Sequence, residues 1–192
     1  RLMKLLLHIC CGPCALMPLA VLREEGHALT GYFDNPNIQP LAEYMRRREG
    51  AIQAAEHAGI PLVFPERQQE YDAKAWCREA LAAAYSEDRG EEKDTNESGG
   101  RCAFCWTSRL RRSAAKAKAL GLSGFTSSLL YSRHQNHEGI RKAGERAGEE
   151  YGVRFVYRDF RPLWQQGIER SKALNIYRQQ YCGCLFSEEE RY

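Results

Sequence analysis

Eight cysteines occur in this chain of 192 residues, and seven of them fall into three tight groups. The groups are Cys10, Cys11 and Cys14; Cys102 and Cys105; and Cys182 and Cys184. Thiolates held a few ångströms apart bind zinc or iron–sulfur clusters, and short Cys spacings can hold them at that separation. A single such pair also occurs by chance or serves thiol–disulfide exchange. The three groups together predict a metal site.

The number of thiols bears on the kind of metal. A structural zinc site is complete with four ligands and would leave three of the grouped cysteines without a role. One [4Fe–4S] cluster on four thiolates, with a second metal on the other three, accounts for all seven and leaves that metal an open position. Two zinc ions that share thiolates are the alternative. Because neighbouring side chains of an extended segment diverge, we expect Cys10 and Cys11 to face different centres.

The eighth cysteine, Cys77, stands apart, and we interpret it as a small buried side chain of a helical segment at residues 76–85.

The only strongly apolar run near the start, Leu5-Leu6-Leu7, is far too short for a membrane span or a signal sequence. We therefore expect a cytoplasmic protein. In that reducing compartment, metal or redox chemistry is favoured over disulfides.

Charge is distributed unevenly along the chain. The net charge is +3, yet residues 101–184 carry 16 Lys and Arg against six Asp and Glu. A segment that basic indicates a polyanionic partner such as nucleic acid. Residues 86–100 are acidic and contain no aliphatic or aromatic side chain, so we expect an acidic surface loop there. The length suits one α/β domain across residues 1–192.

The elements that must position the cysteines alternate between two kinds. We expect strands at residues 4–9, 28–33, 62–64, 125–131 and 153–157, and helices at residues 18–25, 40–59, 107–120, 137–151 and 167–180. This alternation predicts an α/β fold with a Rossmann-like parallel sheet, whose sites lie at the carboxyl ends of the strands. Cys10 and Cys11 follow the first strand, where such a site belongs. Cys182 and Cys184 follow the last helix, so the tail must fold back to reach them.

Short motifs run from one end of the chain to the other. They are His8-Ile9-Cys10-Cys11-Gly12-Pro13-Cys14; Asn35-Pro36-Asn37-Ile38 with Glu43-Tyr44 and Arg47; Arg101-Cys102-Ala103-Phe104-Cys105 with Arg109-Leu110; Ser127-Ser128-Leu129-Leu130 with His134-Gln135-Asn136-His137-Glu138; Asp159-Phe160-Arg161; Arg170-Ser171; and Tyr177-Arg178-Gln179-Gln180-Tyr181-Cys182-Gly183-Cys184. In this order they resemble the motifs of the QueH-type, cobalamin-independent epoxyqueuosine reductases. The last motif is the most specific.

The resemblance implies reduction of the epoxide of epoxyqueuosine, at the wobble position of a tRNA anticodon loop, to the cyclopentene of queuosine. It also implies a [4Fe–4S] cluster beside a mononuclear iron, on a fold similar to the nucleotide-hydrolase-like (PP-loop-like) domains. Some members of that family have Asp at the position of Cys14, which makes Cys14 a ligand of the second metal. The hypothesis that follows gives the cluster Cys102, Cys105, one of Cys10 and Cys11, and one of Cys182 and Cys184, and gives the second metal the other two with Cys14.

Removal of an epoxide oxygen requires two protons as well as two electrons. His134, His137 and Asp159 are the candidate catalytic residues, because they follow predicted strands in loops that can face a substrate. Each has a structural alternative: a hydrogen-bonded histidine, or an ion pair of Asp159 with Arg161 or Arg178. We expect His8 to pack behind the metal.

Basic and aromatic residues are interleaved in the second half of the chain, as in proteins that stack single-stranded bases and hold phosphates. The candidates for tRNA contact are Arg109, Arg111, Arg112, Tyr131, Arg133, Trp164 and Tyr177. Since the chain has no flavin fingerprint, we expect a separate electron donor such as ferredoxin or flavodoxin.

Three other functions are consistent with parts of this pattern. The main alternative is a zinc-binding tRNA interaction module without catalysis. A tRNA-thiolating enzyme of similar fold needs a Gly/Ser-rich ATP-phosphate loop after the first strand, where this chain has His8-Ile9-Cys10-Cys11. A thioredoxin-like oxidoreductase would leave five grouped cysteines without a role.

Overall fold

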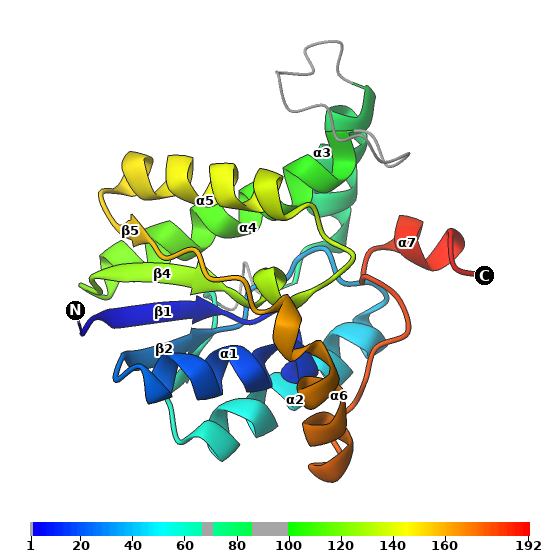
Figure 1. Ribbon diagram of the computed structural model, residues 1–192. Coiled ribbons are helices and arrows are strands. Elements are labelled where there is room, and N and C mark those ends of the chain that lie inside the picture. Colours follow the sequence, from blue (N-terminus) through cyan, green and yellow to red (C-terminus); the bar gives the residue numbers. More distant parts are fainter. Residues whose placement is uncertain (1, 67–70, 86–99) are drawn as a thin grey trace.

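The computed structural model describes residues 2–66, 71–85 and 100–192 (Figure 1). Its strands form one parallel sheet in the order β3-β2-β1-β4-β5. They are β1 (Lys4–His8), β2 (Ala28–Tyr32), β3 (Leu62–Val63), β4 (Gly124–Ser127) and β5 (Arg154–Phe155). The predicted α/β fold with a parallel sheet is confirmed. The predicted acidic loop lies outside the described residues, except for Gly100.

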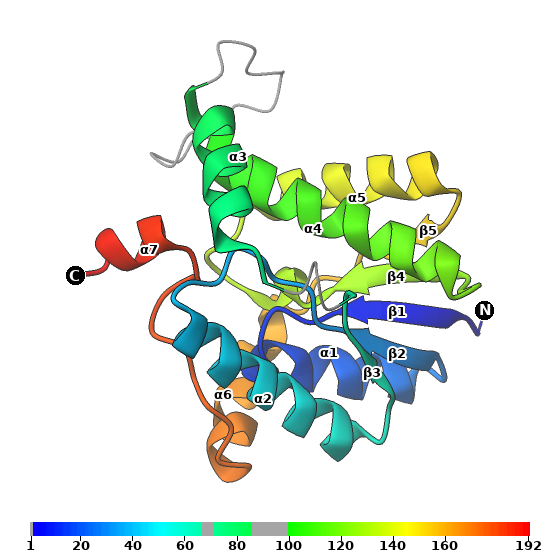
Figure 2. The same ribbon diagram turned by 180° about the vertical axis from the view of Figure 1, so that it is seen from behind.

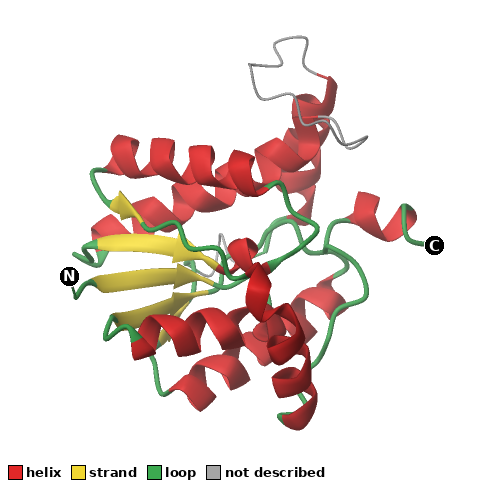
Figure 3. Ribbon diagram, viewed as in Figure 1, coloured by secondary structure: helices red, strands yellow, loops and turns green. Residues whose placement is uncertain are grey.

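Helices cover both faces of the sheet (Figures 1, 2 and 3). One face carries α1 (Gly12–Glu24) and α2 (Leu41–Ala58), and the other carries α4 (Gly100–Ala119) and α5 (His137–Tyr151). Helix α3 (Ala73–Tyr85) packs on α4, and helix α6 (Trp164–Ala173) packs on α1. The described residues also include the short helix α7 (Leu185–Glu189) and the 3-10 turns η2 (Ser128–Tyr131) and η3 (Arg161–Leu163). Among the described residues, no helix has the length and apolar character needed to cross a membrane.

The winding of the chain reverses between β1 and β4, which lie side by side at the centre of the sheet. In a doubly wound sheet this reversal leaves a crevice at the carboxyl ends of the two strands. Leu5, Leu6 and Leu7 of β1 are completely buried, because a central parallel strand is covered by helices on both faces. The segment that follows β1 is therefore anchored by the core and opens directly into the crevice.

Helix α1 begins at Gly12, directly after this segment, and not at residue 18 as predicted. Pro13 stands in the first turn, where proline is well tolerated, and Pro18 lies inside the helix. A side chain at Gly12 would collide with the backbone carbonyl of Gly50 in α2, so this glycine permits the close approach of the two helices. The result is a compact strand-to-helix turn that contains Cys11.

Two other boundaries differ from prediction and change how cysteines are placed. Helix α4 begins at Gly100 rather than at residue 107, so Cys102 and Cys105 lie one turn apart on a helix and not across a loop. The predicted helix at residues 167–180 is wrong beyond residue 173, where α6 ends. Asn175 adopts a left-handed conformation with φ 51°, which stops the helix.

Residues 176–184 form an irregular tail that folds back toward the sheet, as Cys182 and Cys184 require. A buried ion pair on α2 holds the tail: Arg47 Nε donates to Glu43 Oε1 over 2.7 Å. The other two guanidinium nitrogens of Arg47 donate to the carbonyl oxygens of Cys182 at 2.8 Å and Tyr181 at 3.0 Å. Glu43 Oε2 accepts a hydrogen bond of 2.6 Å from the Tyr177 hydroxyl. One ion pair thus ties α2 to the segment that carries the last two cysteines.

We predict that Arg47→Met loosens the tail and destabilises the fold. The substitution removes three hydrogen bonds and leaves the buried Glu43 carboxylate unpaired, which lowers the free energy of unfolding by about 3–5 kcal/mol. Urea denaturation of the metal-free protein measures this loss. Alkylation of Cys184, which is buried in the intact fold, should accelerate in parallel and can be followed by peptide mass spectrometry.

Arg141→Met is the matched control, because Arg141 forms an Arg–Glu ion pair with Glu138 on the exposed face of α5. Exposed pairs of this kind contribute little. Equal losses of stability in the two variants, or an unchanged alkylation rate of Cys184 in Arg47→Met, would show that the buried pair does not hold the tail.

Candidate metal centre

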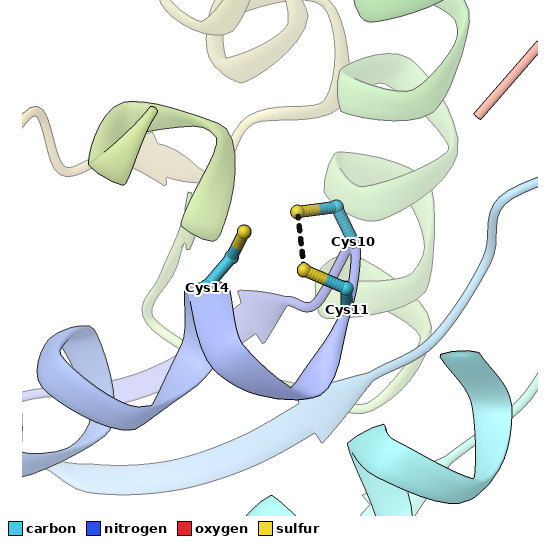
Figure 4. A group of neighbouring side chains, drawn as sticks. All are labelled: Cys10, Cys11 and Cys14. Carbon is cyan, nitrogen blue, oxygen red and sulfur yellow. Dashed lines mark hydrogen bonds between the residues drawn. The ribbon is translucent and has the colours of Figure 1, made fainter. Parts of the chain in front are cut away.

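The Sγ atoms of Cys10, Cys11 and Cys14 all lie within 4.8 Å of one another, and their side chains point into a common space (Figure 4). The Sγ atoms of Cys10 and Cys11 are 3.9 Å apart. Two thiolates on one tetrahedral metal with bonds near 2.3 Å stand about 3.8 Å apart, so this separation fits a single ion. The expectation that these two neighbours diverge is wrong. The chain bends at Cys10, just beyond the end of β1 and before α1 begins at Gly12, so the geometry of a straight strand does not apply here.

The three thiols differ in their acidity. Hydrogen bonds from Cys11 and Cys14 hold the pKa of Cys10 well below its usual value. Burial raises the pKa of Cys11, and the hydrogen bond to Cys10 is the main cause that raises the pKa of Cys14. Cys10 is therefore the group's preferred thiolate, and the thiolate is the form that binds metals.

Polar groups from two distant segments hold this first cysteine group in place. The Ser128 hydroxyl accepts a hydrogen bond from the backbone N–H of Cys10 at 2.9 Å and lies 3.3 Å from its Sγ. The side-chain amide of Gln179, in the tail, donates to the Sγ atoms of Cys11 at 3.0 Å and Cys14 at 3.5 Å. Amide and hydroxyl donors to sulfur are the contacts that tune thiolate-bound metals.

His8 lies completely buried at the end of β1, two residues before Cys10. Its ring nitrogens face the Ser127 hydroxyl at 2.9 Å and the backbone carbonyl of Asp34 at 3.2 Å. Burial lowers the pKa of His8 to about 4, so the ring is neutral at neutral pH. Both nitrogens are occupied by protein partners, and His8 therefore supports the strand end and does not offer itself as a ligand.

The remaining four grouped cysteines lie on α4 and on the tail. Burial raises the pKa of Cys105 to about 12, and the nearby thiols of Cys182, Cys184 and Cys102 add to the rise. Cys105 and Cys184 are buried in one apolar cluster, whereas Cys182 is exposed. The four thiols are thus electrostatic neighbours contributed by two segments far apart in the sequence.

Cys77 is not isolated from the grouped cysteines. It is half-buried on α3 and packs against the apolar cluster that contains Cys105 and Cys184. Burial, and next the nearby Cys184, raise its pKa. The interpretation of Cys77 as a small packing side chain fits these contacts, although its exposure is greater than expected for a core residue.

One cavity of about 440 Å³ connects the group Cys10, Cys11 and Cys14 with the other four grouped thiols. Its wall includes Cys10 and Cys14 from the first group, Cys182 from the other four, and the side chains of His134 and Trp164. This volume falls within the range of small-molecule sites. The cavity lies at the carboxyl ends of the central strands, where the topology predicts a site.

The structure separates the three predicted catalytic residues. Only His134 lines the cavity; its ring stands edge-on to Trp164 with the centroids 5.8 Å apart. His137 is buried at the start of α5, with Nε2 3.1 Å from the carbonyl oxygen of Ser132. Asp159 forms an ion pair of 2.7 Å with Arg161 and lines a different hollow.

Burial also divides the residues predicted to contact tRNA. Arg109 and Tyr131 are only 3% and 2% exposed, so neither side chain lies on the outer surface, where a tRNA backbone would bind. Sequence reasoning missed the roles of Arg47 in holding the tail and of Gln179 in contacting thiols. Both lie within motifs noted above, but a one-dimensional pattern does not reveal that residues 47 and 182 meet.

Solved structures support the assignment of the fold. The chain is similar to the U34-tRNA thiolase NcsA from Methanococcus maripaludis with its [4Fe-4S] cluster, with a TM-score of 0.56, 12% identity, and coverage of 96% of this chain and 61% of that one. It is also similar to a predicted subunit of a tRNA methyltransferase from Methanocaldococcus jannaschii, with a TM-score of 0.51, 10% identity, and coverage of 84% and 74%. At these identities the likeness shows a shared fold, and the expected PP-loop-like architecture is confirmed.

Comparison of sequences is more specific. The family model for epoxyqueuosine reductase QueH matches residues 5–190. Relatives of that name from Thermotoga maritima and Dehalococcoides mccartyi are 36% and 35% identical, over 97% and 98% of this chain and 91% and 94% of their own lengths. A relative from Histophilus somni is 38% identical over 96% of this chain and 72% of its own. The chain therefore belongs to the epoxyqueuosine reductase QueH family.

Proposed function

We propose that this chain reduces the epoxide of epoxyqueuosine in tRNA to the cyclopentene of queuosine. Its family supports the reaction, because relatives named for it match nearly the full length of the chain. Within the molecule, one observation carries the proposal: thiols from two separate cysteine sets line a single cavity of small-molecule size. Such a cavity can admit one substituted ring beside metal centres on its wall.

The proposed ligands form two sets. Cys10, Cys11 and Cys14 hold a mononuclear iron, and their mutual approach within 4.8 Å supports one ion with an open fourth position. The other set, which binds the [4Fe–4S] cluster, consists of Cys102, Cys105, Cys182 and Cys184. Because each cluster thiolate binds a different iron atom, these sulfurs need not lie as close together as those of a single ion. This division replaces the one inferred from sequence, which gave the cluster either Cys10 or Cys11.

The reaction takes up two electrons and two protons, breaks two C–O bonds of the epoxide and releases its oxygen as water. Bound at these cysteines, the cluster would supply single electrons, and the iron would supply a Lewis acid for the epoxide oxygen. His134, exposed on the cavity wall beside Trp164, delivers a proton from an imidazole nitrogen to the departing oxygen. His137 and Asp159 lie off this cavity, and the proposal gives them supporting roles in the loops around it.

Accessible residues at and beside the cavity could bind the nucleotides of the anticodon. The guanidinium of Arg133 lies over the Trp164 ring, 5.8 Å from its centroid, and both residues are accessible. Arg178 on the tail and Arg191 on the cavity wall add positive charge. Unpaired bases stack on such aromatic and guanidinium surfaces while the cations hold phosphates.

The electron donor and the compartment follow from the same proposal. A small carrier such as ferredoxin or flavodoxin supplies the electrons, because the 192 residues contain no G-x-G-x-x-G motif for a bound nicotinamide or flavin dinucleotide. The cytoplasm suits unpaired thiols and a tRNA substrate.

We predict that anaerobic, iron-loaded protein with dithionite converts epoxyqueuosine to queuosine in tRNA. Cys14→Ser should keep the absorbance of the cluster but lose activity by about 100-fold or more, because polarisation of an oxygen by a metal is worth several kcal/mol. Nucleoside analysis by mass spectrometry measures the product. Cys77→Ser, outside both proposed ligand sets, is the control and should retain iron and activity. Full activity of Cys14→Ser would remove the second metal from the mechanism.

We also predict that tRNA affinity falls steeply with salt and that Arg133→Gln lowers the slope of log K against log salt by about 1. Filter binding between low and moderate salt measures the slope. Arg154→Gln is the control, because Arg154 is exposed at the start of β5, at the opposite end of the sheet from the cavity. An affinity independent of salt would point instead to a free nucleoside as substrate.

A further inference from the structure

Arg109 is a buried cation at the centre of the metal-binding region. It lies on α4, one turn after Cys105, and is only 3% exposed. Its Nε donates to the carbonyl oxygen of Cys105 at 3.1 Å, Nη1 to Asn35 Oδ1 at 3.4 Å, and Nη2 to the Cys105 Sγ at 3.4 Å. These partners are a carbonyl, an amide and a thiol, so none of them supplies a formal negative charge unless the thiol ionises.

No carboxylate of the described residues forms an ion pair with Arg109. The two buried carboxylates of this region pair with other arginines: Asp34 with Arg112 at 2.6 Å, and Glu43 with Arg47 at 2.7 Å. A buried, unbalanced charge is costly, and an arginine cannot shed its proton to avoid that cost. The negative charge that compensates Arg109 must therefore come from groups other than carboxylates.

The guanidinium contacts the thiol of Cys105 and lines one cavity with Cys10, Cys14 and Cys182. Cys105, Cys182 and Cys10 are the groups that act most strongly on Arg109 by charge, and Arg109 lines the cavity that Cys10 and Cys182 share. Arg47 also lies near Cys10 and Cys11, but its charge is already balanced by Glu43. Arg109 is thus the buried cation whose neighbours of opposite charge are sulfur atoms from both proposed ligand sets.

We propose that Arg109 is the counter-charge of the thiolate-bound centres and raises the reduction potential of the cluster. A fixed positive charge in a region of low dielectric favours addition of an electron to a negatively charged cluster. Arg109 is a positioning and tuning residue, because its proposed action is on the charge of the cluster and not on the reacting atoms of the substrate. The inference rests on the proposed function, because it requires that a cluster binds.

The first test compares the reduction potentials of the wild type, Arg109→Lys and Arg109→Gln. Each protein is reconstituted anaerobically, its iron and sulfide are quantified, and the potential is measured by dye-mediated titration followed by EPR. We expect Arg109→Gln to shift the reduction equilibrium toward the oxidised cluster by tenfold or more, about 59 mV per tenfold for one electron. Arg109→Lys, which keeps the charge, should stay closer to the wild type. The control is Arg111→Gln on the exposed side of the same helix, paired with Glu150, and it should leave the potential unchanged.

An unchanged potential in a fully loaded Arg109→Gln protein overturns the inference and leaves the proposed function intact. A wild-type chain that binds no cluster overturns the proposed function itself. If Arg109→Gln loses the cluster while Arg109→Lys retains it, charge is the requirement and the inference stands. Equal loss of the cluster in both variants shows that only the shape of the arginine matters, and contradicts it.

A second measurement separates compensation of charge from ordinary hydrogen bonding and does not depend on activity. Arg109→Met should lower the Tm of metal-loaded protein more than that of metal-free protein, because the cation is fully balanced only when thiolates and metal are present. Equal decreases in the two forms mean that the hydrogen bonds to Asn35 and Cys105 are all that Arg109 contributes, and that result refutes the proposal.

Discussion

The sulfur atoms of Cys10, Cys11 and Cys14 lie close together in this protein, although thiolates repel one another and buried charges are costly. The other features of the structure serve this constraint. Three segments far apart in the sequence supply the thiols: the end of β1, the first turns of α4 and the tail before α7. Among their neighbours is a buried guanidinium with no carboxylate partner in the described part of the chain. Thiolates at these sulfurs would balance the charge of this guanidinium.

The parallel sheet provides the fixed point. Its central strand is covered on both faces, so the residues after His8 emerge from a rigid core into the crevice between β1 and β4. The remaining thiols reach this point by other means. Helix α4 carries two cysteines on its first turns, and the irregular tail is fastened to α2 by the Glu43–Arg47 pair. A site of this kind depends on long-range contacts, and the tail contributes as much to it as the sheet does.

Local patterns predicted what depends on local order: the alternation of strands and helices, the parallel sheet, and the position of the first cysteine group after β1. They failed where a contact between distant residues decides the geometry. Divergence of Cys10 and Cys11 is correct for a straight strand, but the chain bends at Cys10, beyond the end of β1. Arg109 has the composition of a nucleic-acid contact, yet tertiary packing buries it beside sulfur atoms.

Mössbauer spectroscopy of protein reconstituted anaerobically with ⁵⁷Fe tests whether two sets of thiols in one cavity hold two different metal centres. We expect about five iron atoms per chain, with the spectrum of a four-iron cluster and a separate component from a single iron in a sulfur-rich environment. Substitution of Cys11 should remove the single-iron component and leave the cluster. A colourless protein that binds zinc and no iron would show that the thiols hold neither centre.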